Sequence, residues 1–332
     1  MRFSLIVSAY NQQDYLRECA ESLLSQPVEL EMVLVDDGST DSTPAMCEEY
    51  AAKDPRVKVL HTKNGGTSAA RNAGAAVAEG DYMIFIDGDD MLVEGCLERV
   101  DSVLKAHSDP DIVLCKIDRY IHETKEIKPY DGVEGLEDCT DIDDFAERLA
   151  VKRNRFSVST CRYAINREFY FRKGLAFDND VWHEDEHFTP LMINAADSVA
   201  VCDGGFYLYR RHEGSKVFTA DIKNLLEFIT VSKTLIKERN KGCSSKQKTD
   251  FLTVRANFLF SRGILEGITA KGNNVRAIKK AAVSAIDIDP AVMDDLPKLK
   301  KYVRVLGKNA GVGCFLRILK LKRSVAGKLK KE

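Results

Sequence analysis

The sequence contains no run of about 18 apolar residues, so it predicts no membrane-spanning helix. It also contains no CxxC pair, although it has nine cysteines, an odd number. This argues against a disulfide framework or a structural zinc site and favours a reducing compartment. The first ten residues, MRFSLIVSAY, lead directly into a strand-like run and lack the pattern of a secretory signal. We therefore expect a cytoplasmic protein.

The two commonest phosphate-binding loops are also absent. The glycines of NGGTSAARNAG, residues 64–74, do not form GxGxxG, and the lysine and hydroxyl of a P-loop are missing at the required spacing. This argues against a dinucleotide-binding fold of the usual kind and against a P-loop NTPase.

Charge is distributed unevenly along the 332 residues. From Lys298 to Glu332 there are 12 Lys or Arg and one acid, which leaves 37 of the 49 basic and 50 of the 51 acidic residues to the rest. This acidic body argues against a nucleic-acid partner. The basic end also carries Phe315, Leu316 and Ile318. It predicts either a helix on an anionic membrane surface, peripheral at the cytoplasmic face, or a terminal helix docked on the domain.

Short apolar runs alternate with helical patterns over the first 110 residues. The runs that predict strands are RFSLIVSAY, LEMVLVDD, VKVLHT and YMIFID. Because these runs are continuously apolar, they predict an α/β fold, Rossmann-like, with a mostly parallel sheet and helices on both faces. The sequence becomes mostly helical after about residue 218, so we expect a first domain over 1–217 and a helical region over 218–332.

Polar clusters follow three of the predicted strands, namely Ser8-Ala9-Tyr10-Asn11, Asp36-Asp37-Gly38-Ser39 and Asp87-Gly88-Asp89-Asp90. Ligands bind at the carboxyl ends of parallel strands, so these clusters are expected along one edge of the sheet. Carboxylates such as Asp87 and Asp89 suit Mg²⁺ or Mn²⁺ that carries a diphosphate. Gly88 lets a ligand approach closely. The alternative is a capped loop, with Asp89 or Asp90 as the N-cap of the next helix.

Three other stretches carry candidate chemistry. In VDDGSTDST, a carboxylate is placed to bind a nucleobase or ribose, but turn and capping chemistry is an equal alternative. Arg71 lies on a helix of small residues, where it would balance phosphate or the acidic cluster, or be partly exposed. His212, in YLYRRHEGS, would either complete a metal shell or belong to an ordinary basic loop.

The stretch DVWHEDEHF, residues 180–188, gathers four acids and two histidines near the only tryptophan. A carboxylate near apolar surface can act as a general base, whereas the alternative is a solvated acidic helix start. His183 and His187 fit the letters of HExxH, but no third zinc ligand or other support for a zinc protease accompanies them.

The motifs SLIVSAYN, VLVDDGSTDST, NGGTSAARNAG, GDYMIFIDGDD and EDEHF, in this order, resemble those of family 2 glycosyltransferases with a GT-A fold. The similarity is close over residues 3–100 and continues to about 215. It implies an inverting enzyme that moves a sugar from a nucleotide sugar, with UDP the favoured nucleotide, to a hydroxyl of a saccharide or lipid-linked saccharide. Surface polysaccharide or glycan assembly would be the setting.

The resemblance also implies roles for individual residues. Nucleotide-sugar binding falls to Ser8, Tyr10, Asp37, Arg71, Asp87 and Gly88. The metal ligands are Asp87, Asp89 and His212, although many members carry Arg at the last position, so metal-free catalysis with basic residues around the diphosphate stays open. Asp185 would be the catalytic base, and Trp182 and Glu184 would meet the acceptor.

Two other function classes stay open. A nucleotidyltransferase on a similar sheet would need a Gly-rich, Lys-containing phosphate loop, which is missing. A non-catalytic nucleotide-sugar-binding module would not need the acids Asp37, Asp87, Asp89 and Asp185, all of which are present.

Overall fold

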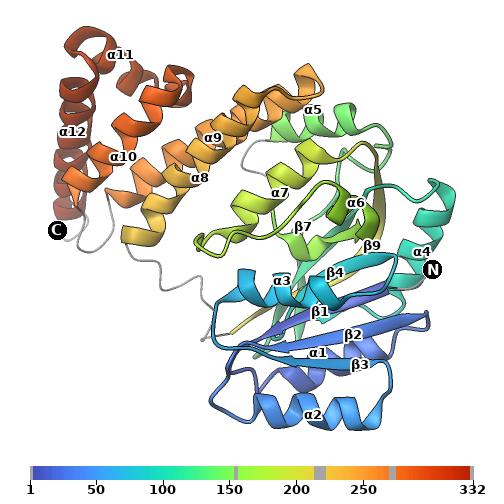
Figure 1. Ribbon diagram of the computed structural model, residues 1–332. Helices are drawn as coiled ribbons and strands as arrows, with labels where there is room; N and C mark the ends of the chain where they lie inside the picture. Colours follow the sequence, from blue (N-terminus) through green and yellow to red (C-terminus); the bar gives the residue numbers. More distant parts are fainter. Residues whose placement is uncertain (1–2, 153–155, 213–221, 269–273, 330–332) are drawn as a thin grey trace. The chain divides into compact units, whose positions relative to one another are not determined.

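Short buried strands alternate with helices through the first part of the computed structural model (Figure 1). The structure describes the backbone of residues 3–152, 156–212, 222–268 and 274–329, and it describes side chains as far as Lys320. The first elements are β1 (Phe3–Ala9), α1 (Leu16–Leu24), β2 (Leu30–Asp36), α2 (Thr43–Lys53), β3 (Val57–His61), α3 (Thr67–Val77), β4 (Tyr82–Asp87), β5 (Met91–Leu92) and α4 (Cys96–Ala106). The predicted strands are therefore confirmed. The short strand β5 was not expected.

The middle of the chain mixes strands and helices. It contains β6 (Ile112–Ile121), β7 (Glu126–Asp131), α5 (Ile142–Lys152), β8 (Tyr163–Asn166), α6 (Arg167–Arg172), α7 (Glu184–Ala195) and β9 (Val199–Arg211). The described C-terminal part is helical, with α8 (Ile222–Lys241), α9 (Lys246–Gly267), α10 (Val275–Ile288), α11 (Pro297–Leu306) and α12 (Lys308–Leu329).

Within the described residues, one nine-stranded sheet has the order β3-β2-β1-β4-β8-β6-β9-β5, with β7 paired to β6. The strands β1 to β4 pair in parallel, as the continuous apolar runs predict. Antiparallel pairing begins where β8 joins β4 and β6, so the sheet is mixed. The α/β fold class is confirmed, and the parallel part is the half that the strand-end clusters follow.

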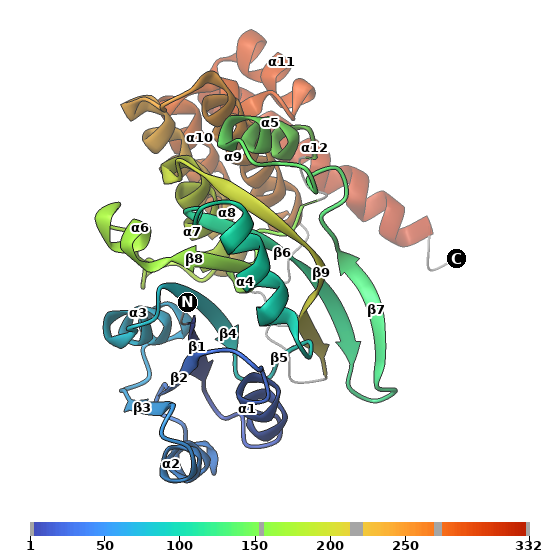
Figure 2. The same ribbon diagram turned by 90° about the vertical axis from the view of Figure 1, so that its right-hand side faces the viewer.

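Helices cover both faces of the parallel half, as Figures 1 and 2 show. Leu5, Val7 and Leu34 share a buried apolar cluster with residues of α1, α2 and α4. Ile6 points to the other face, where α3 packs so closely that a Cβ at Gly74 would lie 2.3 Å from Ile6 Cγ2. The small residues of α3 thus bring this helix close to β1.

The contacts divide the chain into two compact units. The first contains residues 1–148, 156–180 and 195–215, and the second contains 149–155, 181–194 and 216–332. The sheet forms the first unit, and α7 belongs with the C-terminal helices in the second. The domain boundary expected at 217 lies outside the described residues, so it stays a prediction.

In the second unit α8 and α9 lie side by side (Figure 1). The Ser232 hydroxyl of α8 donates to the Ala256 carbonyl of α9 at 2.8 Å. A Cβ at Gly263 would lie 2.6 Å from Ile229 Cγ1, so a glycine is needed for this close approach. Among the described residues, no helix has both the length and the apolar composition needed to cross a bilayer.

Candidate active site

The three strand-end clusters lie along one edge of the sheet. The parallel register places Ala9 opposite Asp36 and Ser8 opposite Asp87. Two backbone bonds continue this pairing past the strand ends, from Asp37 N to Ala9 O and from Gly88 N to Ser8 O, each 2.9 Å. The expectation of a shared edge, which rests on parallel pairing alone, is therefore confirmed.

Asp87 faces a buried cation. Arg71 Nη2 donates to Asp87 Oδ1 at 3.0 Å, and the Arg71 side chain is only 1% exposed. The Ser8 hydroxyl lies 3.4 Å from the same oxygen, and the Cys161 thiol lies 3.8 Å from the other. Of the roles considered for Arg71, the partly exposed arginine is wrong, and charge balance of the acidic cluster is what the contacts show.

Asp89 meets a histidine instead. His212 Nε2 lies 3.1 Å from Asp89 Oδ2, and both side chains are mostly buried. The His212 ring also packs against Tyr15, with ring centroids 4.4 Å apart. Two adjacent ligands of an octahedral ion at about 2.1 Å lie about 3 Å apart, so this pair fits a shared cation. His212 therefore does not belong to an ordinary exposed loop.

Asp90 is buried and holds β9 in place. Tyr207 OH donates to Asp90 Oδ2 at 2.6 Å, and Arg210 N donates to Asp90 Oδ1 at 2.7 Å. Burial raises the pKa of Asp90 well above its usual range, and the charges of Asp89 and Asp87 add to this effect. The capping alternative is wrong, because α4 begins at Cys96 with Gly95 as its N-cap.

Arg210 ties the two strand ends together. Its side chain is fully buried, and Nε donates to the Asp89 carbonyl at 2.6 Å. The other guanidinium nitrogens lie 2.9 Å from His122 Nδ1 and Glu18 Oε2. His212 is two residues after Arg210, so these bonds also fix the backbone from which the His212 side chain extends. The buried Arg210 side chain thus holds the backbone on both sides of the contact between Asp89 and His212.

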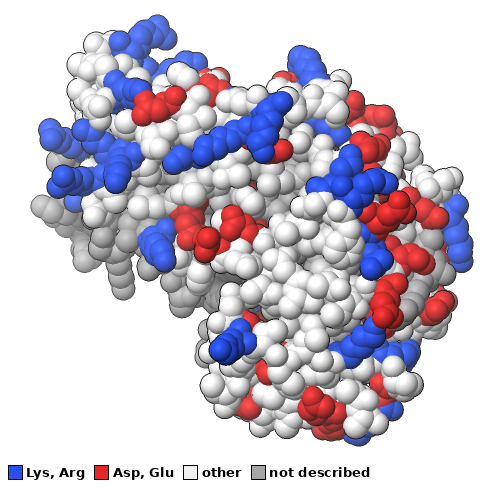
Figure 3. All heavy atoms as spheres, in the orientation of Figure 1, with Lys and Arg blue, Asp and Glu red and all other residues white. Residues whose placement is uncertain are grey.

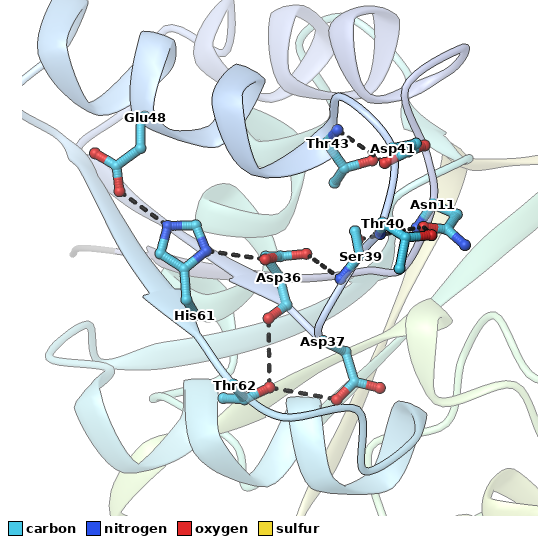
Figure 4. A network of polar contacts seen from close by, with 10 residues as sticks. All are labelled: Asn11, Asp36, Asp37, Ser39, Thr40, Asp41, Thr43, Glu48, His61 and Thr62. Carbon is cyan, nitrogen blue, oxygen red and sulfur yellow. Dashed lines mark hydrogen bonds and ion pairs between the residues drawn. The ribbon is translucent and has the colours of Figure 1, made fainter.

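Asp37 anchors the loop before α3. Its Oδ1 accepts hydrogen bonds from Gly65 N at 2.8 Å and Thr62 Oγ1 at 3.3 Å, and its Oδ2 accepts one from Gly66 N at 2.8 Å. Figure 4 shows the bond between Thr62 and Asp37. Oδ1 has used both acceptor positions in these bonds, and Oδ2 has used one.

The neighbouring Asp36 binds a histidine (Figure 4). Its Oδ2 lies 2.9 Å from His61 Nδ1, and the other ring nitrogen lies 2.9 Å from Glu48 Oε1. The hydrogen bond to Asp36, followed by the one to Glu48, raises the pKa of His61. Burial raises the pKa of Asp36, but hydrogen bonds from Ser39 and His61 outweigh it, so the net pKa is lowered. The carboxylates of Asp36 and Asp37 are thus both hydrogen-bonded within the protein.

The same turn chemistry orders the segment before α2. The Asp41 carboxylate accepts hydrogen bonds from Thr43 N at 2.9 Å and Gln13 N at 3.1 Å, and Asn11 Oδ1 accepts one from Thr40 N at 2.8 Å. These bonds tie the loop after β1 to the loop after β2 and leave the Tyr10 ring 44% exposed. Gly88 lies against Ala9, where a Cβ would approach Ala9 Cβ to 3.2 Å.

Asp185 lies in the second unit, in the first turn of α7, beside Glu184 and Glu186. Asp185 and Glu184 are half-buried, and Trp182 is 40% exposed. The free N–H groups of a helix start favour carboxylates there. Asp185 belongs to the second unit and the sheet edge to the first, so the catalytic role expected for Asp185 stays a prediction.

The two histidines of HEDEH do not form a zinc site. His183 Nε2 lies 3.1 Å from the Asn224 carbonyl, and its ring stacks on Phe228 with centroids 3.9 Å apart. Burial lowers the pKa of His183 to about 4. In the described part of the chain, no three His, Cys, Asp or Glu side chains converge as a metal cluster. The ligand set predicted from Asp87, Asp89 and His212 stays a prediction, and Asp89 and His212 are the two of these residues that contact each other.

Sequence reasoning missed the roles of Asp90, Tyr207 and Cys161. A usable signal lay in YLYRRH, because Tyr207 and Arg210 lie five and two residues before His212. Their partners lie 117 and 120 residues earlier in the chain, so the pattern itself does not reveal the pairing.

Comparison with protein families gives a match to the glycosyl transferase family 2 model over residues 4–175, more than half of the chain. Among relatives, the uncharacterized glycosyltransferase EpsJ of Bacillus subtilis strain 168 is 33% identical over 214 residues, 64% of this chain. The match spans 62% of the length of EpsJ. Glycosyltransferase GlyG of Streptococcus pneumoniae serotype 4 is 31% identical over 224 residues, 64% of this chain and 71% of GlyG.

Solved structures share the fold over most of the chain. Residues 1–349 of Staphylococcus aureus TarS in complex with UDP-GlcNAc superpose with a TM-score of 0.77 at 23% identity, covering 98% of this chain and 92% of that one. The mannosyltransferase PcManGT of Pyrobaculum calidifontis, in complex with GDP-Man and Mn²⁺, has a TM-score of 0.51 at 18% identity and covers 96% and 87%. With the sheet-edge clusters and the family match, these likenesses give one conclusion: the chain belongs to glycosyl transferase family 2 and has the GT-A fold.

Proposed function

We propose that this protein transfers a sugar from a nucleotide sugar to a hydroxyl of a saccharide or lipid-linked saccharide, with inversion, in surface polysaccharide assembly. The observation that carries the proposal is the edge of the sheet, where Asp87 pairs with Arg71 and Asp89 pairs with His212. UDP-GlcNAc is the first donor to test, because the TarS relative is a poly(ribitol-phosphate) beta-N-acetylglucosaminyltransferase, 26% identical over 331 residues, and its structure holds UDP-GlcNAc.

Different residues of the chain would bind the base and the diphosphate of the donor. Oδ2 of Asp37 has a second acceptor position, which we assign to an N–H of the base. We also assign the exposed Tyr10 and the Ser8 hydroxyl to the nucleotide. Arg71 offsets the charge of Asp87 so that a diphosphate can approach over Gly88. Asp89 and His212 would hold Mn²⁺ or Mg²⁺, which would stabilise negative charge on the departing diphosphate.

Asp185 is the proposed base. As the acceptor hydroxyl attacks the anomeric carbon, the Asp185 carboxylate takes its proton, and the bond from the sugar to the diphosphate breaks. Trp182 is exposed enough to stack on an acceptor sugar, with Glu184 available for its hydroxyls.

The activity test measures nucleoside diphosphate release from UDP-GlcNAc, UDP-glucose, UDP-galactose and GDP-mannose, with Mn²⁺ and with a chelator. A parallel reaction measures pyrophosphate release from UTP and a sugar 1-phosphate. UDP release that the chelator abolishes is expected. Pyrophosphate release would instead indicate a nucleotidyltransferase, and nucleotide binding without any release would indicate a binding module.

Asp185→Asn tests the base. General-base catalysis contributes roughly 10²–10⁴-fold, so turnover should fall by about that factor while UDP binding, measured by calorimetry, is retained. Asp180→Asn removes an acid from the same stretch, five residues earlier, and should leave turnover near wild type. Near wild-type turnover in Asp185→Asn would remove Asp185 as the base.

We also propose that α11 and α12 meet an anionic membrane surface at the cytoplasmic face. In the described residues, Lys298, Lys301, Arg304 and Arg317 are exposed on these two helices, and Val305 and Leu306 are 69% and 47% exposed beside them. Figure 3 shows Lys and Arg gathering over this part of the molecule. Cations beside exposed apolar groups are what an anionic bilayer surface binds.

A further inference from the structure

The helix α7, which carries Asp185, packs with the C-terminal helices in one compact unit. Residues 181–194 form one compact unit with residues 216–332, whereas the strands lie in the other unit. The helical region therefore has a direct structural connection to the proposed base.

Two contacts fix the chain just before Asp185. The backbone N–H of Trp182 donates to Glu227 Oε2 of α8 at 2.7 Å. His183 lies against the same helix, stacked on Phe228 with an angle of 12° between the rings and hydrogen-bonded to the Asn224 carbonyl. The approach to α7 is thus held by one face of α8.

An ion pair fixes the chain just after Asp185. Glu186 is buried and pairs with Arg255 of α9, whose side chain is 6% exposed. Arg262, two turns further along α9, lies 3.5 Å from the other carboxylate oxygen of Glu186 and covers the Phe228 ring at 4.2 Å. A buried carboxylate with two arginines cannot leave this position cheaply, because a buried charge without its partner is strongly unfavourable.

These contacts set the direction of Asp185. Successive side chains of an α-helix are about 100° apart around its axis, since 3.6 residues make one turn. Burying Glu186 against α9 fixes the rotation of α7, and this rotation decides where the neighbouring Asp185 carboxylate lies. A base displaced by about 1 Å can cost about 10²-fold in rate.

We propose that Glu186 and Arg255 are positioning residues for the base, and that the helical C-terminal region serves catalysis by holding α7 in register. This rests on the proposed function, because it takes Asp185 as the base. Neither residue touches the donor in this assignment. Their loss should therefore lower the turnover number and leave nucleotide affinity unchanged.

The test compares two ion pairs of the same unit. Arg255→Met breaks the pair with Glu186, and Arg239→Met breaks the mostly buried pair of Arg239 with Asp289, which does not involve α7. Each full-length variant is measured for UDP release from UDP-GlcNAc with Mn²⁺, for the UDP dissociation constant by calorimetry, and for thermal stability.

We expect similar losses of thermal stability in the two variants but different kinetics. Arg255→Met should lower kcat by roughly 10–100-fold with an unchanged UDP dissociation constant, and Arg239→Met should keep the wild-type kcat. Arg255→Lys keeps the charge and should recover part of kcat. Glu186→Gln, a nearly isosteric change, serves as the second variant if Arg255→Met does not fold. It should also lower kcat and leave the UDP dissociation constant unchanged.

Equal kcat losses in Arg255→Met and Arg239→Met, or a UDP dissociation constant that weakens together with kcat, would overturn the positioning role. Wild-type kcat in both Arg255→Met and Glu186→Gln would do the same. If Asp185→Asn is inactive in that case, the base stands and only the positioning role fails. If Asp185→Asn is itself active, the base and the positioning role fail together.

Discussion

At the end of β4, three carboxylates that are close neighbours in sequence have three different surroundings. Asp87 contacts a buried arginine, Asp89 contacts His212, and Asp90 is buried among hydrogen-bond donors. The sequence predicts that these acids need positive partners, but it does not show which partner contacts which acid. Their division follows from β9 and the residue after it, because β9 supplies Tyr207 and the Arg210 backbone to Asp90, and His212 contacts Asp89.

Asp90→Leu should destabilise the protein strongly. Leucine cannot accept hydrogen bonds, so Arg210 N loses its buried acceptor and Tyr207 OH loses one of its partners. A buried donor left unpaired costs about 1–3 kcal/mol, and we expect a total loss of roughly 2–4 kcal/mol in the free energy of unfolding. Urea denaturation measures this difference.

Asp90→Asn is the matched control for that prediction. The amide keeps the shape and still accepts from Arg210 N, but its nitrogen cannot accept from Tyr207 OH. It therefore leaves one donor unpaired instead of two and should cost about 1–2 kcal/mol, less than Asp90→Leu. If the asparagine variant were as unstable as the leucine variant, the hydrogen-bonding account of Asp90 would be wrong.

His183 should make the protein sensitive to acid. Its folded pKa of about 4 lies below the ordinary value of 6.5, so the unfolded chain takes up a proton first as the pH falls. Stability should therefore decline between about pH 6.5 and 4, by on the order of 2 kcal/mol from this group, and be fully present above about pH 7.

The measurement compares the pH dependence of unfolding in wild type and in His183→Gln, whose amide can still donate to the Asn224 carbonyl. The difference in the free energy of unfolding between the two proteins should be largest at neutral pH and should decrease toward pH 4. His107→Gln controls for the removal of a histidine, since that residue is exposed after α4. Parallel curves for wild type and His183→Gln would contradict the buried neutral histidine.

At the scale of elements, the packing of α3 on β1 places Arg71 at the sheet edge. Gly74 lies one turn after Arg71 and contacts Ile6. Gly74→Ala would push a methyl group into Ile6 Cγ2, which should cost about 1–3 kcal/mol despite the better helix propensity of alanine. It should also weaken UDP binding, because α3 moves away from the strand together with Arg71.

A double-mutant cycle checks the cause of that loss. Ile6→Ala removes the Cγ2 atom that the new methyl meets, so Gly74→Ala should cost less in the Ile6→Ala background. Strict additivity of the two substitutions in urea denaturation would mean that Gly74 acts in some other way.

The sequence predicted the parallel half of the fold and failed where pairing becomes long-range. Continuous apolar runs and small-residue helices are local signals, so β1 to β4 and α3 were read correctly. The exposed strand β7 has little apolar character, and the two-residue β5 exists only because it pairs with β9. The capping prediction for Asp90 failed for the same reason, since its partners come from β9.

At the scale of the whole molecule, charge separates along the chain. The basic residues gathered after Lys298 contrast with the acidic remainder. We expect binding to phosphatidylglycerol vesicles but not to phosphatidylcholine vesicles in co-sedimentation. Replacing Lys298, Lys301, Arg304 and Arg317 with glutamine should weaken that binding by roughly 10–500-fold, since each cation contributes up to about 1 kcal/mol near an anionic surface.

The matched control replaces four exposed lysines of the first unit, namely Lys53, Lys63, Lys105 and Lys128. It changes the net charge equally and should keep vesicle binding. Equal loss in both variants would show a general charge effect, and no binding by the wild type would remove the membrane proposal.

The interleaving of the two units has a consequence for synthesis on the ribosome. Glu186 emerges 69 residues before Arg255, so at about 5–20 residues per second its cation arrives roughly 3–14 seconds later. The last strand, β9, ends at Arg211, so the whole sheet is made within that interval, before Arg255 of α9 is available to Glu186. A nascent chain would therefore acquire its donor-binding edge first and its catalytic competence last, and a product that ends before α9 would bind nucleotide without turning it over.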